Sequence, residues 1–258
     1  MFGKILFSSL PRENRYLYRF CKKYVDRYRN ENNDNMQSNG EAEFMASELP
    51  SCRTVFDVGA NVGQWATMAL RVNASIALHC FEPSRVTYER LVANSFPPNV
   101  ICNNIGLGSA SSVSQLLIFE DGSGLNSLYR REGLEAGWGI GVNVRAESVH
   151  LETLDSYVER RGITSTIDLC KIDVEGHELE VLRGMTATLK RRQMGTIQFE
   201  YGGCNIDSRV LLKDIFAFLK AHDYELYKMH PKSLRHVPGY DQRLENFQYQ
   251  NWVARRSQ

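Results

Sequence analysis

The stretch VFDVGANVGQW at residues 55–65 has the pattern of a buried strand, a glycine-rich turn and the first turn of a helix. Apolar spacing typical of a helix continues over residues 64–72. Downstream, short apolar runs at residues 75–81, 99–105, 167–172 and 196–199 alternate with helical patterns at 85–94, 154–161, 178–190 and 210–221. This alternation predicts βαβ units, and therefore an α/β fold with a mostly parallel sheet and helices on both faces.

Two parts of the chain depart from the alternation. After the third predicted strand, the pattern at 112–119 and 142–151 predicts two strands around a loop at 121–141, which we interpret as a β-containing insertion. The last two strands, at 224–229 and 247–253, have no helix between them, so we expect an antiparallel pair at the end of the sheet. We assign residues 51–258 to this domain and residues 1–50 to an N-terminal helix and linker.

The N-terminal helix is predicted by apolar and basic residues that alternate at three- and four-residue steps over residues 12–29. We expect it to dock on the protein's own core with its basic face in solvent. A peripheral membrane contact and a homodimer face are the alternatives. The polar tract NENNDNMQSNG at residues 30–40 predicts a loop or mobile linker.

Composition excludes several classes of protein. The 258 residues include 31 Lys and Arg against 30 Asp and Glu, and a net charge of +1 does not favour nucleic acid as a partner. No apolar run is long enough to span a bilayer, and no cleavage site for a signal peptide follows the first ten residues. None of the six cysteines forms a CxxC pair, and Cys80, Cys102 and Cys170 lie in predicted strands. We therefore expect reduced core thiols and a cytoplasmic location.

The first turn indicates which ligand the sheet binds. A dinucleotide site favours GxGxxG, but Asn61 stands two residues after Gly59, and Asp57 would repel a diphosphate. A carboxylate suits an ammonium group instead, so the turn favours S-adenosylmethionine over NAD. A βα turn with no ligand is the alternative. The expected cofactor residues in this turn are Asp57, Gly59, Ala60, Asn61, Gly63 and Gln64.

A second motif, Phe81-Glu82-Pro83, ends the second predicted strand. An acidic residue about 20 positions beyond the glycine turn can accept hydrogen bonds from both ribose hydroxyls of an adenosine, and Glu82 has that offset. A carboxylate that interacts with a helix dipole is the alternative. Asn104, at the end of the third predicted strand, is placed to contact adenine.

A third motif, KIDVEGHE at residues 171–178, ends a predicted central strand with several ionisable groups. The alternative is that these acidic side chains only cap the start of the following helix. The sharper hypothesis places Asp173 beside the methyl donor and Glu175 or His177 against the acceptor, with Glu200 in the same crevice. His177 is the first choice of base and Glu175 the second. These four residues could also bind magnesium or manganese, but no spacing demands a metal, and we assign none.

The insertion loop is the expected acceptor site. Tyr129 and Trp138 can stack on a sugar face or an apolar ring, and Asn126 can bond hydroxyl groups. Ser127, Arg130 and Arg131 add further donors. A plain surface loop with no part in binding is the alternative.

Together the motifs VFDVGANVGQW, FEP, KIDVEGHELEVLRG and IQFEYG, in this order and spacing over residues 40–253, resemble the FkbM family of S-adenosylmethionine-dependent methyltransferases. The resemblance implies a seven-stranded class I methyltransferase fold, which is Rossmann-like, and O-methyl transfer to a hydroxyl of a sugar, glycan, glycolipid or polyketide-type natural product. It implies that Asp57, Gly59, Asn61 and Gly63 hold the methionine end of the cofactor and Glu82 the ribose. A catalytically silent binding module and a nicotinamide oxidoreductase remain the rival functions.

Overall fold

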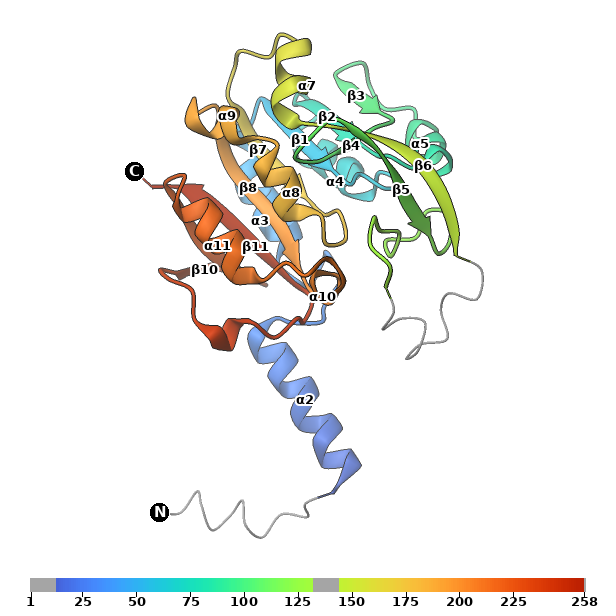
Figure 1. Ribbon diagram of the computed structural model, residues 1–258. Coiled ribbons are helices and arrows are strands. Elements are labelled where there is room, and N and C mark those ends of the chain that lie inside the picture. Colours follow the sequence, from blue (N-terminus) through green and yellow to red (C-terminus); the bar gives the residue numbers. More distant parts are fainter. Residues whose placement is uncertain (1–12, 132–143, 258) are drawn as a thin grey trace.

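The computed structural model describes residues 13–131 and 144–257, and its centre is an eight-stranded sheet in the order β10-β9-β11-β8-β7-β1-β2-β3 (Figure 1). The five strands from β8 to β3 run parallel, whereas β11 is antiparallel to both β8 and β9, and β10 is antiparallel to β9. The strands are β1 (Thr54–Val58), β2 (Ala77–Phe81), β3 (Val100–Asn103), β7 (Ile167–Ile172), β8 (Met194–Tyr201), β9 (Tyr224–His230), β10 (Ser233–Val237) and β11 (Gln250–Arg256).

Strand β1 shows why the apolar runs become central strands. All five of its residues are buried, because β2 and β7 flank it and helices cover both faces. Phe56 packs into the core on one side of the sheet and Val55 into the core on the other. A strand buried on both faces has no polar alternation, which explains the continuous apolar pattern of the sequence.

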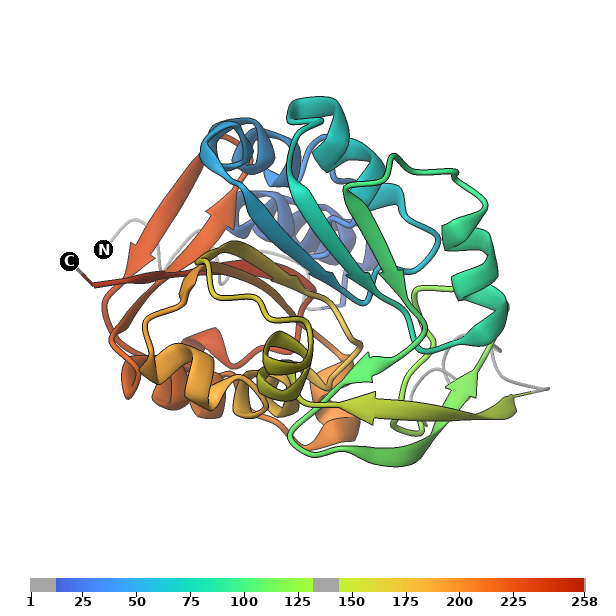
Figure 2. The same ribbon diagram turned by 90° about the horizontal axis from the view of Figure 1, so that it is seen from above.

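Helices cover the two faces in separate groups (Figure 2). The core that contains Val55 also takes apolar residues from α3 (Glu41–Glu48), α4 (Gln64–Val72) and α5 (Arg85–Val92). The core that contains Phe56 takes them from α7 (Leu154–Arg160), α8 (Glu178–Arg183), α9 (Thr186–Lys190) and α11 (Leu212–Lys220). The predicted α/β sheet with helices on both faces is confirmed.

The insertion forms a separate three-stranded sheet in the order β4-β6-β5, seen at the lower right of Figure 2. Its strands are β4 (Gly106–Leu107), β5 (Ser112–Ile118) and β6 (Arg145–Glu152). Leu116, Ile118, Val149 and Leu151 form its small core. The predicted β-containing insertion after the third strand is therefore confirmed, with β4 as an additional short strand.

Three details differ from the sequence-based expectation. The main sheet has eight strands rather than seven, because β10 forms a hairpin with β9. The expected antiparallel pair is present as β9 and β11, but β10 rather than either of them is the edge strand, and β11 lies between β8 and β9. The helix expected over 178–190 is divided into α8 and α9 at Gly184, whose carbonyl accepts a hydrogen bond from the N–H of Asp155 and whose Cα faces the backbone of Gly108.

The N-terminal part corrects two further expectations. The basic helix is present as α2 (Arg15–Arg29), but it does not dock on the core: none of its fifteen residues, all described, is buried. The tract at 30–40 contains no strand or long helix, yet it is anchored, since Asn30 and Glu31 are buried and Glu31 pairs with Lys228 at 2.6 Å. The domain boundary at residue 50 stays a prediction, and α3, which precedes it, packs on the sheet.

Two minor expectations can be compared directly. All six cysteines are free thiols, and Cys80 and Cys170 are buried as expected, while Cys102 is partly exposed. The cytoplasmic location inferred from them stays a prediction. His79 is a core residue, with Nδ1 2.7 Å from the Tyr157 hydroxyl. Within residues 13–131 and 144–257, no helix has the length and apolar character needed to cross a bilayer.

Candidate active site

A cavity of about 740 Å³ opens at the carboxyl ends of β1, β2, β7 and β8. Open α/β sheets bind ligands at this edge, because the loops that follow the strands diverge there. Of the residues expected from the sequence, those that line the cavity are Gly59, Ala60, Asn61, Gln64, Glu82, Pro83, Asn126, Asp173, Glu175, His177 and Glu200. Asp57, Gly63, Asn104 and Tyr129 stand behind the wall, and Trp138 lies outside the described residues.

The glycine turn after β1 is forced by a close backbone approach. Gly59 has a φ of 78°, and a Cβ atom there would lie 1.8 Å from the carbonyl oxygen of Asp173. The turns after β1 and β7 are therefore in direct contact, which no side chain at position 59 would allow. The N–H groups of Gly59 and Ala60 both donate to the carbonyl of Phe81, which ties this turn to β2.

Glu82 is fixed at the cavity wall by backbone donors. Its Oε2 accepts from the N–H of Asn61 at 3.1 Å, and its Oε1 accepts from the N–H of Ser84 at 2.9 Å. Burial raises the pKa of Glu82 to about 7. Asn104 supports this turn from behind, since its Nδ2 donates to the carbonyls of Glu82 and Pro83. Each carboxylate oxygen keeps a further lone pair that can accept from a ligand hydroxyl.

Lys171 connects the first and third motifs. Its Nζ donates to the carbonyl of Gly59 at 2.9 Å and lies 3.1 Å from Asp57 and 3.4 Å from Asp173. Burial lowers the pKa of Lys171, but the two carboxylates more than offset this and hold its pKa above the ordinary value. Asp57 is completely buried, so its charge acts on the cavity through Lys171 rather than by direct contact.

The turn after β7 points Glu175 into the cavity. Glu175 has a φ of 53° and Gly176 a φ of 99°, so two consecutive residues are left-handed. Glu178 stabilises this turn, because its Oε1 accepts from the N–H groups of Val174 and Gly176. A non-glycine residue in this region is strained and is held there by its surroundings. Glu178 therefore makes the backbone hydrogen bonds that were expected from helix capping in this motif. Asp173 and Glu175 line the cavity instead.

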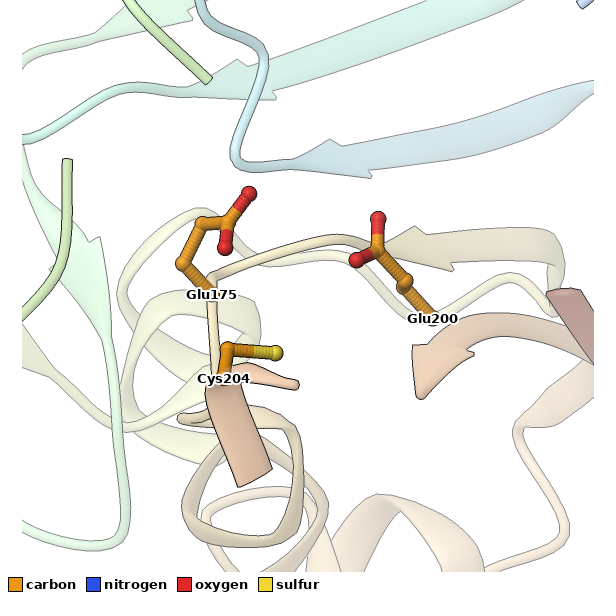
Figure 3. A group of neighbouring side chains, drawn as sticks. All are labelled: Glu175, Glu200 and Cys204. Atoms are coloured by element: carbon orange, nitrogen blue, oxygen red, sulfur yellow. The ribbon is translucent and has the colours of Figure 1, made fainter. Parts of the chain in front are cut away.

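Glu175 and Glu200 converge from neighbouring elements. One ligand atom of each and the Cys204 sulfur all lie within 4.8 Å of one another, and Figure 3 shows both carboxyl groups pointing to the same side. Burial raises the pKa of Glu175 to about 8, although Arg131 donates to it at 2.6 Å. Burial, followed by the charges of Asp173 and Glu175, raises the pKa of Glu200 well above its ordinary value. This cluster can hold a proton or a cation.

His177 is positioned by the insertion. Its Nδ1 lies 2.8 Å from the Tyr129 hydroxyl, and a Cβ built on Gly108 would meet its Nε2 at 3.0 Å. Burial lowers the pKa of His177, so the ring is neutral near pH 7. The ring therefore lies between the Tyr129 hydroxyl and Gly108, at the edge of the cavity that it lines.

The described part of the insertion loop, residues 121–131, lies over the same side of the cavity. Ser127 Oγ donates to the carbonyl of Glu175 at 2.8 Å, so loop and β7 turn are joined through backbone as well as through Arg131. Asn126 lines the cavity, but its Oδ1 accepts from Phe119 and its Nδ2 donates to Glu120. Both polar atoms of the Asn126 side chain are thus hydrogen-bonded within the loop.

Several cavity residues were not anticipated. Glu41, in α3, is buried, and its carboxylate accepts from the side-chain amides of Asn39, Gln198 and Asn251. Asp34 and Tyr249 also line the cavity. Lys171 could have been recognised, since a lysine inside an apolar strand requires a carboxylate partner. Glu41 carried no comparable signal, because two of its partners, Gln198 and Asn251, come from distant strands.

Acidic side chains outnumber basic ones around the cavity. Among the described residues that line it, two side chains are cationic, Lys171 and Arg131. Six are acidic, namely Asp34, Glu41, Glu82, Asp173, Glu175 and Glu200. Burial raises the pKa of four of these six, namely Glu41, Glu82, Glu175 and Glu200. A cationic ligand would favour their ionised forms, whereas a ligand that carries phosphates would oppose them.

Residues 57–226 match the family model described as the Methyltransferase FkbM domain. This span runs from the end of β1 into β9 and contains the glycine turn, Glu82 and the third motif. With the strand order described above, the match confirms the expected class I methyltransferase fold, apart from the eighth strand.

Individual relatives have low sequence identity to this chain. The chain is 27% identical over 181 residues to the 31-O-demethyl-FK506 methyltransferase FkbM of Streptomyces tacrolimicus, a match that covers 57% of this chain and 69% of the relative. It is 31% identical over 152 residues to the hexuronic acid methyltransferase AglP of Haloferax volcanii, covering 57% of this chain and 56% of that protein. The crystal structure of methyltransferase FkbM from Methylobacillus flagellatus matches 78% of this chain and 43% of its own, with 14% identity and a TM-score of 0.46.

Proposed function

The chain belongs to the FkbM methyltransferase family, and we propose that it transfers a methyl group from S-adenosylmethionine to a hydroxyl of a sugar, glycan or natural-product acceptor. The observation that carries the cofactor assignment is the excess of carboxylates in the cavity wall. S-adenosylmethionine carries a sulfonium and an ammonium group, which favour ionised carboxyl groups, and no phosphate, whereas the diphosphate of NAD would be repelled by each carboxyl group that ionises. An oxygen acceptor is supported by the relatives named for a 31-O-demethyl compound and for a hexuronic acid.

We propose one orientation for the cofactor. Glu82 would accept the ribose hydroxyls, because both of its oxygens are fixed by backbone N–H groups and retain acceptor capacity. Asp173 and the backbone at Gly59 would hold the methionine end, with Asp57 acting through Lys171. The two ends of the cofactor would thus meet the turns after β2 and β7, with the methyl group near Glu175.

Glu175 is the proposed general base. S-adenosylmethionine, when bound, supplies an electrophilic methyl group whose carbon–sulfur bond breaks as the acceptor oxygen attacks, leaving a neutral thioether. Glu175 takes the hydroxyl proton, and a base whose pKa lies near the working pH does this efficiently. The positive charge of the cofactor, when bound near Glu175, favours the ionised form of its carboxyl group, which is the form that accepts a proton. The left-handed backbone at Glu175 and its contact with Arg131 hold the carboxylate in place.

His177 has a different proposed role from the one that the sequence favoured. Its contacts with Tyr129 and with the Gly108 backbone support a positioning residue that fixes the insertion loop against the cavity. Tyr129 does not line the cavity, so it would affect acceptor binding by holding the loop in place rather than by stacking on the acceptor. The acceptor would instead contact the lining residues of the loop, such as Leu125 and Arg131.

The experiment that tests the proposal combines binding and transfer. We expect S-adenosylmethionine and S-adenosylhomocysteine to raise the melting temperature of the protein, and NAD to leave it unchanged. With isotopically labelled cofactor and a panel of uronic acids, oligosaccharides and polyketide scaffolds, one acceptor should gain a single labelled methyl group by mass spectrometry. Stabilisation by NAD with none by S-adenosylhomocysteine would indicate an oxidoreductase instead. Cofactor binding with transfer to no hydroxyl acceptor would support the silent binding module.

A further inference from the structure

Helix α2 carries an aromatic face that no described part of the chain covers. Four aromatic side chains at four-residue steps form this face and are between 66% and 84% exposed: Tyr16, Phe20, Tyr24 and Tyr28. A fifth, Tyr18, is 65% exposed on the other side of the helix. Figure 1 shows the helix projecting from the body beyond α10 (Cys204–Ser208). This concentration of exposed rings differs from the scattered single apolar residues of an ordinary surface.

The helix turns its polar side to the body. Lys22 Nζ donates to Gln248 Oε1 at 3.2 Å and pairs with Asp26 at 3.0 Å. At 100° per residue, Lys22 and Asp26 lie on the side opposite Tyr24 and Tyr28, so the aromatic face points away from the protein. A helix that docks on its own core has the reverse orientation.

The root of the helix is firmly held. The buried side chain of Asn30, just after α2, donates to the carbonyls of Asn39 at 2.6 Å and Met229 at 3.0 Å. The N–H of Asn32 donates to the carbonyl of Tyr249, a residue that lines the cavity. These contacts fix where α2 leaves the body, and they place that point beside the cavity.

The charge of α2 identifies the chemistry of its partner. The helix has six basic residues and one acidic residue, Asp26, which gives +5 in a chain whose total is +1. The basic residues are Arg15, Arg19, Lys22, Lys23, Arg27 and Arg29. A cationic face behind a band of aromatic side chains is typical of a helix that lies in the headgroup region of a bilayer, where tyrosine can bury its ring and keep its hydroxyl in water.

We propose that α2 docks this protein on the surface of a membrane that contains anionic phospholipids. The aromatic face enters the headgroup region, and the basic side chains beside it on the helix, Lys23 and Arg27, contact lipid phosphates. The other basic residues add to the attraction to an anionic surface. A second copy of the chain suits the face less well, because pairing two helices would bring two charges of +5 together and would bury tyrosine hydroxyls against each other. Docking would also bring the cavity close to the lipid surface; a lipid-linked acceptor follows only if the proposed function holds.

The test measures flotation of the full-length protein with vesicles of phosphatidylcholine alone and with added phosphatidylglycerol. We expect at least tenfold more bound protein on the anionic vesicles, and a loss of that excess in high salt. The double variant F20E/Y24E should lose at least tenfold of the binding. V113E is the matched control, since Val113 is 61% exposed on β5, far from α2 in the sequence, and this variant should bind as wild type does.

Three outcomes would overturn the proposal. They are equal binding to neutral and anionic vesicles, no binding to either, and wild-type binding by F20E/Y24E. A dimer in sedimentation analysis that F20E/Y24E converts to monomer, without vesicle binding by wild type, would assign the face to a second copy. Because S-adenosylhomocysteine binding is measured on the same samples, failure of membrane docking is distinguishable from failure of the proposed methyltransferase function.

Discussion

On the proposed cofactor side of the cavity, the key groups are held by backbone, whereas on the proposed acceptor side they are held by side chains from the insertion. Glu82 is fixed by two N–H donors, and Gly59 by direct contact with the turn after β7. Glu175 depends instead on Arg131, and His177 on Tyr129, which lie 44 and 48 positions away in the sequence. Backbone contacts give a rigid binding site, while side-chain contacts leave the acceptor side adjustable. Binding and turnover should therefore be separable by mutation.

The largest effect is expected for Glu175→Gln. This change removes the proposed base but keeps the shape of the side chain, so turnover should fall by about 10²–10⁴-fold. Cofactor affinity, measured by calorimetry, should stay within about threefold of wild type, because Glu82 and Lys171 are untouched. Glu43→Gln, on the exposed side of α3, is the matched control and should be fully active. A parallel loss of cofactor affinity would place Glu175 on the cofactor side.

A pH profile sharpens the same assignment. The pKa of Glu175 in the free protein is about 8, so kcat/KM should rise with pH up to about that value and then level off. The rise should be absent in Glu175→Gln.

Glu82→Gln should show the opposite behaviour. Loss of a charged acceptor for the ribose hydroxyls should weaken S-adenosylhomocysteine binding by about 10–100-fold. Turnover at saturating cofactor should change much less. Glu89→Gln, on the exposed surface of α5, serves as control. Unchanged affinity in Glu82→Gln would mean that the ribose lies elsewhere.

A smaller effect is expected for His177→Ala. If His177 positions the loop through Tyr129, turnover should fall by roughly tenfold and KM for the acceptor should rise, with cofactor affinity nearly intact. Tyr129→Phe, which removes the hydroxyl that faces His177, should reproduce part of the defect. A loss as large as that of Glu175→Gln, with a wild-type response in Tyr129→Phe, would restore His177 as the base.

The smallest effect concerns stability. Burial raises the pKa of Glu82 and Glu178 to about 7 and of Glu175 to about 8, from an ordinary value of 4.5. Between about pH 4.5 and 8, these carboxyl groups are protonated in the folded protein but ionised in the unfolded chain. The free energy of unfolding of the ligand-free protein should therefore fall as pH rises through this range. Urea denaturation at about pH 5.5 and 6.5 should show this fall, and Glu175→Gln should reduce it by on the order of 1 kcal/mol. A rise over the same range would contradict the buried carboxyl cluster.

The sequence predicted the parts of the fold that depend on local pattern. Strands such as β1 and the turn at Gly59 follow from apolar runs and glycine spacing, and both are present. The aromatic and apolar residues of α2 and α11 have the same helical spacing, yet α11 buries Leu212, Ile215, Phe216 and Leu219 while α2 buries none. Amphipathic spacing predicts a helix but does not say which surface covers it.

Part of the candidate site could also be predicted from the sequence. The three motifs identified Glu82, Asp173 and Glu175 because strand ends in a parallel sheet share one edge. The contacts of Glu41 with Gln198 and Asn251 could not be predicted, since they join residues 157 and 210 positions apart. Nor could the position of Asp57 behind Lys171, because register between β1 and β7 decides it.

The central claim is that this cavity is built for a cationic cofactor, and calorimetry in two buffers of different ionisation enthalpy tests it most directly. S-adenosylmethionine, with a net charge of +1, should bind near pH 7.5 and release protons from the raised carboxyl groups. Neutral S-adenosylhomocysteine should bind with a smaller release, and NAD should not bind. Binding of NAD, or binding of S-adenosylmethionine with proton uptake, would contradict the account.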